Sequence, residues 1–347
     1  MRRVKSYIVS IMKDERKTAD ARVAGVFLSI VSYAYFALLQ LMYFLRKIKI
    51  LPRHKVRPKV ISVGNITLGG TGKTPFTIFL ARHVQFMGRK VTVLHRGYGN
   101  DESVLLKEKL AGIPVIIGRD RVKNALQAYD EFKSDCVVLD DGFQHHRICR
   151  DLDILLIDST NPFGNMKIFP RGILREPLAR LRDAHVAILT KSDMGGGNIE
   201  AIEKEIHRYN KDLDIAQSYY EPVDLQRLFS KETIPLSYLK DRRLSLVSGI
   251  ANPDYFSWIV ERLGATVVDK FCYEDHYGFE ESDVSTICNA ARKRGVRLII
   301  TTEKDAVRLR RFQTAFGELD LAALRVEFRV RKDEKKILGR LHSICNS

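Results

Sequence analysis

Residues 59–75 read KVISVGNITLGGTGKTP, a β-branched apolar run followed by a glycine-rich loop and then by Lys73 and Thr74. A strand that leads through such a turn into a helix points successive backbone N–H groups at one spot, where they stabilise a bound anion. Lys73 would reach the β- and γ-phosphates of a nucleotide, and the Thr74 hydroxyl would hold Mg²⁺. The stretch therefore predicts a site for a nucleoside triphosphate.

The loop differs at one position from the pattern G-x-x-x-x-G-K-[ST], because Thr67 stands where the first glycine is usual. Three other glycines leave the backbone free to adopt positive φ angles. The alternative is a glycine-rich turn with a chance Lys-Thr after it, and the flanking strand and helix patterns argue against it. The predicted nucleotide-binding residues are Thr67, Gly69, Gly70, Thr71, Gly72, Lys73 and Thr74.

Apolar runs of strand length alternate with helix-length segments from residue 59 onward. Such alternation is typical of βαβ units and of a parallel sheet covered on both faces. A second series of runs after about residue 225 predicts a smaller α/β domain. We therefore expect an α/β fold in four parts: a basic, apolar, membrane-associated helix segment at 1–58, a P-loop NTPase-like parallel-sheet domain at 59–225, the smaller α/β domain at 226–330, and a C-terminal helix or tail at 331–347.

The composition limits the class of protein. The five cysteines are odd in number and form no C-x-x-C pair, so neither a disulfide framework nor a zinc knuckle is predicted and a reducing compartment is favoured. The 347 residues carry a formal net charge of +16. Residues 1–59 hold fourteen Lys and Arg against three acidic residues, so most of the excess positive charge lies in this segment.

The basic segment brackets an uncharged run from Val23 to Leu45. As a helix the run would measure about 35 Å at roughly 1.5 Å per residue, enough to cross a bilayer core of about 30 Å. Basic residues at both ends give no positive-inside asymmetry and suit a helix that lies in an anionic leaflet. A spanning helix, a buried core helix and a nucleic-acid-binding arm are the alternatives, and the long charged region before the run disfavours a secretory signal.

Two further stretches place charged residues at the sheet edge where the nucleotide is expected to bind. CVVLDDGFQHHR places Asp140 and Asp141 at the end of an apolar strand, where a P-loop fold needs a carboxylate for Mg²⁺. Downstream, FPRGILREP supplies Arg171, Arg175 and Glu176 in a loop expected at the same sheet edge. An arginine there would neutralise charge on a transferring phosphoryl group, although neighbouring Arg and Glu in a loop are more often a solvated pair.

The chain resembles the tetraacyldisaccharide 4′-kinase (lipid A 4′-kinase) family over most of its length. The resemblance rests on a combination of motifs: VGNITLGGTGKTP, RGYG at 96–99, DDGFQHHR at 140–147, PRGILREP at 170–177, DHYGF at 275–279 and TEKDAV at 302–307. It implies two α/β domains joined by a short β-ribbon, with the chemistry at the P-loop between them.

The resemblance also implies an activity. The enzyme would transfer the γ-phosphate of ATP, with Mg²⁺, to the 4′-hydroxyl of an acylated glucosamine disaccharide 1-phosphate, a step in the biosynthesis of lipid A and thus of lipopolysaccharide. This places the protein at the cytoplasmic face of the bacterial inner membrane, with an anionic membrane surface as its partner. Neither nucleic acid nor an obligate protein partner is expected.

Family members pair an aspartate, in an acidic motif after RGYG, with the histidine of DHYGF. In this chain the intervening stretch is missing, so Asp101 and Glu102 follow directly, with Ser103 where proline is usual. The resemblance implies that Asp101 accepts the proton of the acceptor hydroxyl while His276 orients it, with Glu102 as the next candidate. The expected catalytic residues are Asp101, His276, Lys73 and Arg175; the metal ligands are Thr74, Asp140, Asp141 and Glu176; and Glu102, Arg121, Gln144, His145 and Arg171 lie near substrate or nucleotide.

Two rival functions start from other features. LTKSD at 189–193 resembles the T-K-x-D guanine-reading motif of GTPases, so the alternative is a membrane-recruited P-loop GTPase or ATPase switch. A nucleic-acid-binding ATPase rests only on the basic arm. Four residues after a strand are a weak signal, and the kinase motifs lie on both sides of them.

Overall fold

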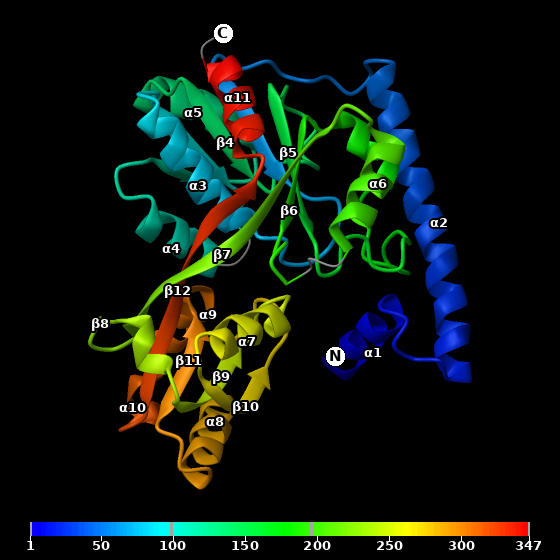
Figure 1. The fold of residues 1–347 in the computed structure, drawn as a ribbon. Coiled ribbons are helices and arrows are strands. Elements are labelled where there is room, and N and C mark those ends of the chain that lie inside the picture. The colour runs from blue at the N-terminus through cyan, green and yellow to red at the C-terminus, as the bar shows by residue number, and fades with distance from the viewer. Residues whose placement is uncertain (1, 98–99, 195–197, 346–347) are drawn as a thin grey trace.

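The computed structural model describes residues 2–97, 100–194 and 198–345, so Tyr98 and Gly99 of the RGYG motif lie outside the described residues. Twelve strands form one sheet in the order β10-β9-β11-β12-β7-β6-β5-β1-β4-β2-β3, and β8 pairs with β7. Most neighbouring strands are parallel, and helices cover both faces (Figure 1). The α/β fold expected from the alternating pattern is therefore confirmed.

Six parallel strands form what we call the P-loop half of the sheet. The apolar runs predicted as strands form them. Side chains of five of the six are buried on both faces, as in a covered parallel sheet, while the edge strand β3 is partly exposed. Their bounds are β1 Lys59–Gly64, β2 Val91–His95, β3 Val115–Ile117, β4 Cys136–Asp140, β5 Leu152–Asp158 and β6 Val186–Thr190.

Three further parallel strands form the second half of the sheet: β9 Arg243–Ser248, β10 Thr266–Cys272 and β11 Leu298–Thr302. They correspond to the second series of apolar runs, predicted after about residue 225. β11 pairs with β9 on one side and with the start of β12 on the other.

A long antiparallel pair joins the two halves. β7 (Asp214–Arg227) starts beside β6, and β12 (Asp320–Lys332) starts beside β11; the short β8 is Thr233–Ile234. β7 and β12 pair from Gln217 with Lys332 to Arg227 with Ala322, which makes the ribbon longer than the short one that the resemblance implied. Because the ribbon is antiparallel, the strands of the two halves run in opposite directions, and the C-terminal ends of both halves face one space between them (Figure 1).

Helices pack on the two faces according to their apolar residues. Buried side chains of α3, α4, α7 and α11 share one cluster with one face of the sheet, while α5, α6 and α8 to α10 bury theirs against the other. The helices are α3 Lys73–Phe86, α4 Asn100–Lys109, α5 Arg121–Phe132, α6 Ile199–Tyr209, α7 Pro253–Arg262, α8 Glu281–Lys293, α9 Glu303–Leu309, α10 Gln313–Phe316 and α11 Glu334–Cys345, with short 3₁₀ turns at Leu178–Asp183, Leu236–Leu239 and Arg310–Phe312.

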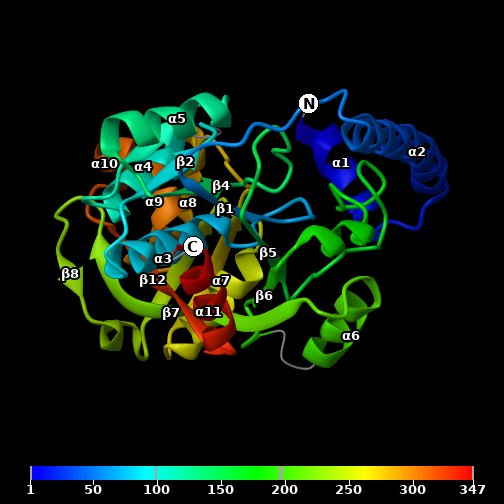
Figure 2. The same ribbon diagram turned by 90° about the horizontal axis from the view of Figure 1, so that it is seen from above.

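The basic N-terminal segment forms α1 (Arg2–Met12) and α2 (Ala19–Lys47), and α2 lies at the periphery of the molecule in both views (Figures 1 and 2). A stripe of small and polar residues on α2 faces the protein: the Ser32 hydroxyl donates to the carbonyl of Ile168 at 2.8 Å. Large apolar side chains point outward, among them Val23, which is 73% exposed, and Phe27, which is 65% exposed. Within the described residues, α2 is the helix long and apolar enough to cross a membrane.

The C-terminal helix α11 is part of the core of the P-loop half. Leu341 is fully buried there, whereas Ser343 on the same helix is exposed. Leu341→Ala should lower the free energy of unfolding by about 2–5 kcal/mol because it leaves a cavity, while the control Ser343→Ala should change it by less than about 0.5 kcal/mol. Chemical denaturation measures both, and equal values would show that α11 does not pack as described.

Candidate active site

The glycine-rich loop takes the expected strand-turn-helix form. It leaves β1, and Gly72 caps the N-terminus of α3 with φ at 88°. A Cβ on Gly72 would collide with the Tyr220 hydroxyl of β7, so this position requires glycine. The buried Tyr220 hydroxyl and the buried Thr71 hydroxyl have no hydrogen-bond partner in the described part of the chain, as expected for polar groups that await a ligand.

A cavity of about 600 Å³ opens where the ends of the two half-sheets meet. The loop and α3 form one wall, and residues that follow β9, β10 and β11 form the opposite wall. Of the predicted nucleotide-binding residues, Gly69, Gly70, Thr71, Gly72, Lys73 and Thr74 line the cavity. Thr67 does not: it is buried and forms an isolated β-bridge with Leu174, so its part is to hold the loop.

The two aspartates after β4 have different environments. Asp140 is buried, accepts hydrogen bonds from the Thr77 hydroxyl at 3.2 Å and lies 3.1 Å from His95 Nδ1. Asp141 instead lies 3.7 Å from Lys73 Nζ and 3.1 Å from the Arg175 guanidinium. Burial alone would raise the pKa of Asp141, but the charges of Lys73 and Arg175 outweigh it and lower that pKa. Asp141 is therefore the carboxylate that lies beside the two cations on the cavity wall formed by the P-loop and α3, which we call the phosphate wall.

Three non-glycine residues that line the cavity have positive φ angles: Asp141 at 53°, Lys191 at 56° and His276 at 60°. Such left-handed conformations cost energy and tend to gather at functional sites. Lys191 forms an ion pair with Asp158 and donates to the Gly70 carbonyl at 3.0 Å, so it fixes the P-loop from the side.

Several predicted residues lie behind the cavity rather than in it. The Arg121 guanidinium is buried and donates to the backbone carbonyl of Asp140 at 2.8 Å; burial lowers its pKa to about 10 despite the nearby aspartates. Gln144 donates to the Asn65 carbonyl at 2.8 Å. Burial and then the charges of nearby arginines lower the pKa of His145 to about 4, so its ring is neutral at pH 7. These side chains support the strand ends.

Two predictions from the FPRGILREP loop need correction. Glu176, expected as a metal ligand, is buried away from the cavity, where the Tyr43 hydroxyl of α2 donates to it and His146 lies 3.8 Å away. Arg171, expected near substrate or nucleotide, instead pairs with Asp14 in the loop between α1 and α2. The physical reason is the docking of α2 along this loop, which only the folded chain reveals.

Arg175 itself remains at the cavity and is held from two sides. Its guanidinium donates to the Asn65 side chain at 3.1 Å as well as to Asp141. Its backbone carbonyl accepts from the Tyr35 hydroxyl of α2 at 3.1 Å. Through Tyr35 and Tyr43, α2 therefore contacts both Arg175 and the residue after it.

The wall opposite the P-loop holds the predicted pair. His276 Nδ1 lies 3.3 Å from a carboxylate oxygen of Asp101, which is buried on α4 and does not line the cavity. His276 and Glu102 do line it. The Lys304 ammonium lies 3.0 Å from Glu102 and 3.1 Å from His276 Nε2, so it joins the two. The structure thus brings Asp101, Glu102 and His276 together, with His276 between Asp101 and the cavity.

Neighbouring charges shift the pKa values of both Asp101 and His276. Burial would raise the pKa of Asp101, but the hydrogen bond from His276 and the charges of Lys304 and Arg308 outweigh it and lower the pKa to about 2. The same hydrogen bond raises the pKa of His276, a rise that burial and Lys304 oppose. Asp101 is therefore ionised at neutral pH, and the imidazole is the better proton acceptor of the two.

Lys304, Lys191, Tyr220 and His95 are site residues that the sequence-based predictions did not include. Lys304 and Lys191 stood in TEKDAV and LTKSD, motifs that had been noted without a catalytic role. Nothing in the local sequence marks Tyr220, because the ribbon alone brings it to the P-loop.

The guanine-reading interpretation of LTKSD is not favoured. The carboxylate of Asp193, which would have to read the base, accepts a hydrogen bond from the Tyr255 hydroxyl at 3.0 Å. Among the described residues, groups of three or more His, Cys, Asp or Glu side chains with metal-site geometry do not occur. A site with one or two carboxylates completed by phosphate oxygens is the pattern that Mg²⁺ uses.

Asp101→Asn should lower the pKa of His276, because the carboxylate contact that raises it is lost. The ring would then lose its proton at a lower pH than in the unchanged protein. NMR titration of the His276 ring measures the shift, with the distant His207 as internal reference. An unchanged His276 titration in Asp101→Asn would contradict the contact.

Comparisons with known proteins identify the family of the chain. The family model described as Tetraacyldisaccharide-1-P 4′-kinase matches residues 24–345. The tetraacyldisaccharide 4′-kinase of Halothermothrix orenii is 32% identical over 344 residues, 89% of each chain, and that of Syntrophus aciditrophicus is 35% identical over 79% of this chain and 80% of its own. The crystal structure of Aquifex aeolicus LpxK in complex with ATP superposes with a TM-score of 0.68 at 26% identity, covering 90% of this chain and 97% of its own. The chain therefore belongs to the tetraacyldisaccharide-1-P 4′-kinase family.

Proposed function

We propose that this kinase transfers the γ-phosphate of ATP, with Mg²⁺, to the 4′-hydroxyl of a tetraacyldisaccharide 1-phosphate at the cytoplasmic face of the bacterial inner membrane. One observation carries the proposal: the P-loop and the Asp101–His276 pair lie on opposite walls of one cavity. A nucleotide held on the first wall would present its terminal phosphate to an alcohol held on the second.

The phosphate wall supplies charge stabilisation. The γ-phosphoryl group passes through a loose transition state whose charge spreads over its equatorial oxygens, so positioning and nearby cations supply most of the catalysis. Lys73 and Arg175 are the two cations that contact Asp141 beside the loop, and Asp141 would hold them in place between reactions.

Mg²⁺ fits the oxygen donors of this wall. The Thr74 hydroxyl and the Asp140 and Asp141 carboxylates are hard ligands that line the cavity beside the loop. Thr74 and Asp141 would hold the ion directly, because Asp140 is already engaged by Thr77 and His95. When bound, the ion would neutralise negative charge on the phosphate oxygens.

The acceptor wall handles the proton of the alcohol. His276 faces the cavity, and the Asp101 carboxylate fixes its Nδ1–H and stabilises positive charge on the ring. The pair would share the proton as the oxygen–phosphorus bond forms and the bond to the β-phosphate oxygen breaks. Glu102, paired with Lys304 at the same wall, would orient the sugar.

The outward apolar face of α2 would lie in the membrane interface and bring the cavity to the lipid acceptor. The seven basic residues from Arg46 to Lys59 would contact headgroup phosphates. A stripe of α2 packs on the protein through Ser32, Tyr35 and Tyr43, which favours a helix lying along the surface over one that crosses the bilayer alone.

The function is tested by following radiolabelled γ-phosphate from ATP into a lipid extract that contains the acylated disaccharide. Lys73→Ala and Thr74→Ala should each abolish transfer, since one removes charge at the phosphate and the other a Mg²⁺ ligand. The exposed Lys211→Ala serves as control and should transfer normally. Near-native turnover by either P-loop variant would rule out this use of the loop, and label that never enters lipid would rule out the function.

Deletion of residues 1–58 should leave a chain that still binds ATP but works poorly on acceptor lipid presented in vesicles, because its local concentration at the bilayer is lost. Sedimentation with vesicles and equilibrium ATP binding measure the two effects. If the shortened chain still sediments with membranes after a high-salt wash, the membrane contact lies elsewhere.

Tyr43→Phe distinguishes two roles of α2: binding to the membrane and positioning of the Arg175 loop. The variant keeps the apolar face of α2 but leaves the buried Glu176 without its hydroxyl donor. Turnover should fall severalfold at unchanged vesicle binding. Tyr33→Phe is the matched control, since Tyr33 is on the same helix and 75% exposed. Equal turnover in the two variants would show that α2 serves as an anchor alone.

A further inference from the structure

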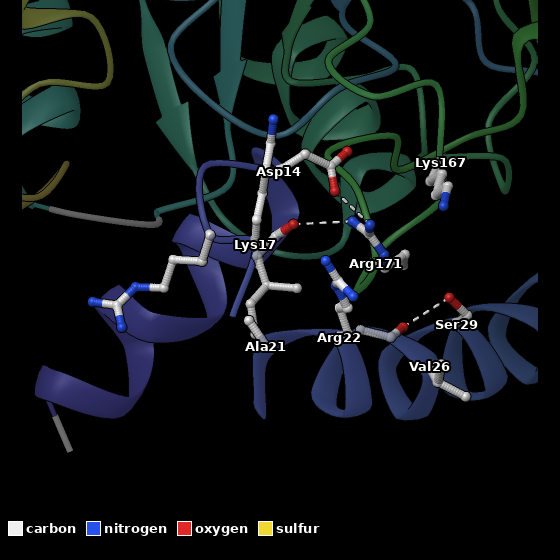
Figure 3. Close-up of a pocket in the computed structure, with 11 residues that line it drawn as sticks. Asp14, Lys17, Ala21, Arg22, Val26, Ser29, Lys167 and Arg171 are labelled. Carbon is white, nitrogen blue, oxygen red and sulfur yellow. Dashed lines mark hydrogen bonds and ion pairs between the residues drawn. The ribbon is translucent and has the colours of Figure 1, made fainter. Parts of the chain in front are cut away.

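A second concave site lies outside the active-site cavity, at the corner between α1 and α2. It has a volume of about 490 Å³ and is formed by three segments: the end of α1 with the loop that follows, the first turns of α2, and the loop around Lys167 and Arg171 (Figure 3). Five of its eleven lining residues are basic and one is acidic. We call it the corner pocket.

An ion pair forms the floor of the corner pocket. The Arg171 guanidinium pairs with Asp14 and donates to the Ile11 carbonyl at 2.9 Å, which ties the loop to the end of α1. Burial would raise the pKa of Asp14, but the hydrogen bond from Arg171 outweighs it, so the pKa is lowered and the carboxylate is ionised and neutralised by its partner. Arg171 is therefore the main counter-ion of Asp14, and the charge of Lys167 lowers the same pKa to a smaller extent.

Three of the remaining cations stand around this floor on different segments: Lys17, Arg22 and Lys167 (Figure 3). All three are exposed, and none takes part in an ion pair among those found in residues 2–97, 100–194 and 198–345. A concave site lined by five basic residues and one acidic residue, with three of the cations outside any ion pair, attracts an anion with several oxygens, for which phosphate is the common biological case.

The surroundings of the corner pocket are apolar. Val26 lines it and is 63% exposed, and Ile30, one helical turn further along α2, is also 63% exposed. Met166 and Phe169 flank Lys167 in the loop and are exposed as well. A phosphate seated among the cations would thus have acyl-chain surface directly beside it.

We propose that the corner pocket binds the phosphate group of a membrane lipid. The inference rests on the proposed membrane contact of α2, and it adds a defined headgroup site to the apolar face of that helix and to the diffuse positive charge of residues 46–59. The phosphate belongs either to bulk anionic phospholipid or to the 1-phosphate of the acceptor lipid, because both present the same oxygens beside acyl chains. Arg171 links the two sites in the chain, since it lies four residues before Arg175.

The test uses the full-length protein and the triple variant Lys17→Gln, Arg22→Gln, Lys167→Gln. A matched control, Lys49→Gln, Arg53→Gln, Lys55→Gln, removes the same charge from exposed positions of the same basic segment outside the pocket. Binding is measured to neutral phosphatidylcholine vesicles and to vesicles that contain phosphatidylglycerol. A basic residue near an anionic surface contributes a factor of about five, so the pocket variant should bind phosphatidylglycerol vesicles up to about 10²-fold more weakly.

The control should lose clearly less affinity than the pocket variant. If both variants lose the same affinity, the charge acts diffusely and the proposal is overturned; if the pocket variant binds like the unchanged protein and keeps its KM, it is overturned as well.

Kinetics in neutral detergent micelles distinguish the sources of the phosphate. A raised KM for the acceptor lipid in the pocket variant assigns the site to the acceptor's own phosphate, and an unchanged KM together with weaker vesicle binding assigns it to bulk phospholipid. Vesicle binding requires no turnover, so failure of the proposed kinase activity would be seen separately.

Discussion

The antiparallel pairing of β7 with β12 is the constraint on which the rest of the structure depends. Parallel half-sheets present their loops at the C-terminal ends of their strands, and the ribbon reverses the second half so that both sets of loops face one cavity. It also carries Tyr220 against Gly72, so the element that joins the halves touches the phosphate loop itself. With a parallel junction the loops of both halves would point in the same direction and would not face each other.

The electrostatics of the cavity divide the chemistry between its walls. Lys73 and Arg175 lie beside Asp141 on the P-loop wall, while the opposite wall holds an ionised carboxylate behind an imidazole. With a pKa of about 2, Asp101 is a weak proton acceptor by itself. In a loose transition state the attacking hydroxyl has lost little of its proton, so a strong base is not required. A carboxylate that stabilises positive charge on His276 is sufficient. The contacts of Tyr35 and Tyr43 extend this network to α2, because they connect a helix with an exposed apolar face to the Arg175 loop.

The sequence predicted those parts of the site that local chemistry determines. The βαβ pattern, the phosphate loop and the carboxylates after β4 follow from strand, turn and helix signals over a few residues each. The pairing of Asp101 with His276, 175 residues apart, came from a family resemblance and not from periodicity. The role of Glu176 was wrong because its partner is Tyr43, more than a hundred residues away on a helix whose docking face carries no local signal. Tyr220 and Lys304 were missed for the same reason: tertiary contact alone brings them to the cavity.

The most direct test of the central claim is a double-mutant cycle on turnover with Asp101→Ala and His276→Ala, with ATP affinity measured for each variant. The account predicts a loss of about 10²- to 10⁴-fold for His276→Ala, which removes the proton-accepting ring, and a loss no larger than that for Asp101→Ala, which acts through the ring. It also predicts little change in ATP affinity and a double variant scarcely worse than the more affected single one. Wild-type turnover in Asp101→Ala, or losses that add independently in the double variant, would contradict the account and make Glu102 the carboxylate to test.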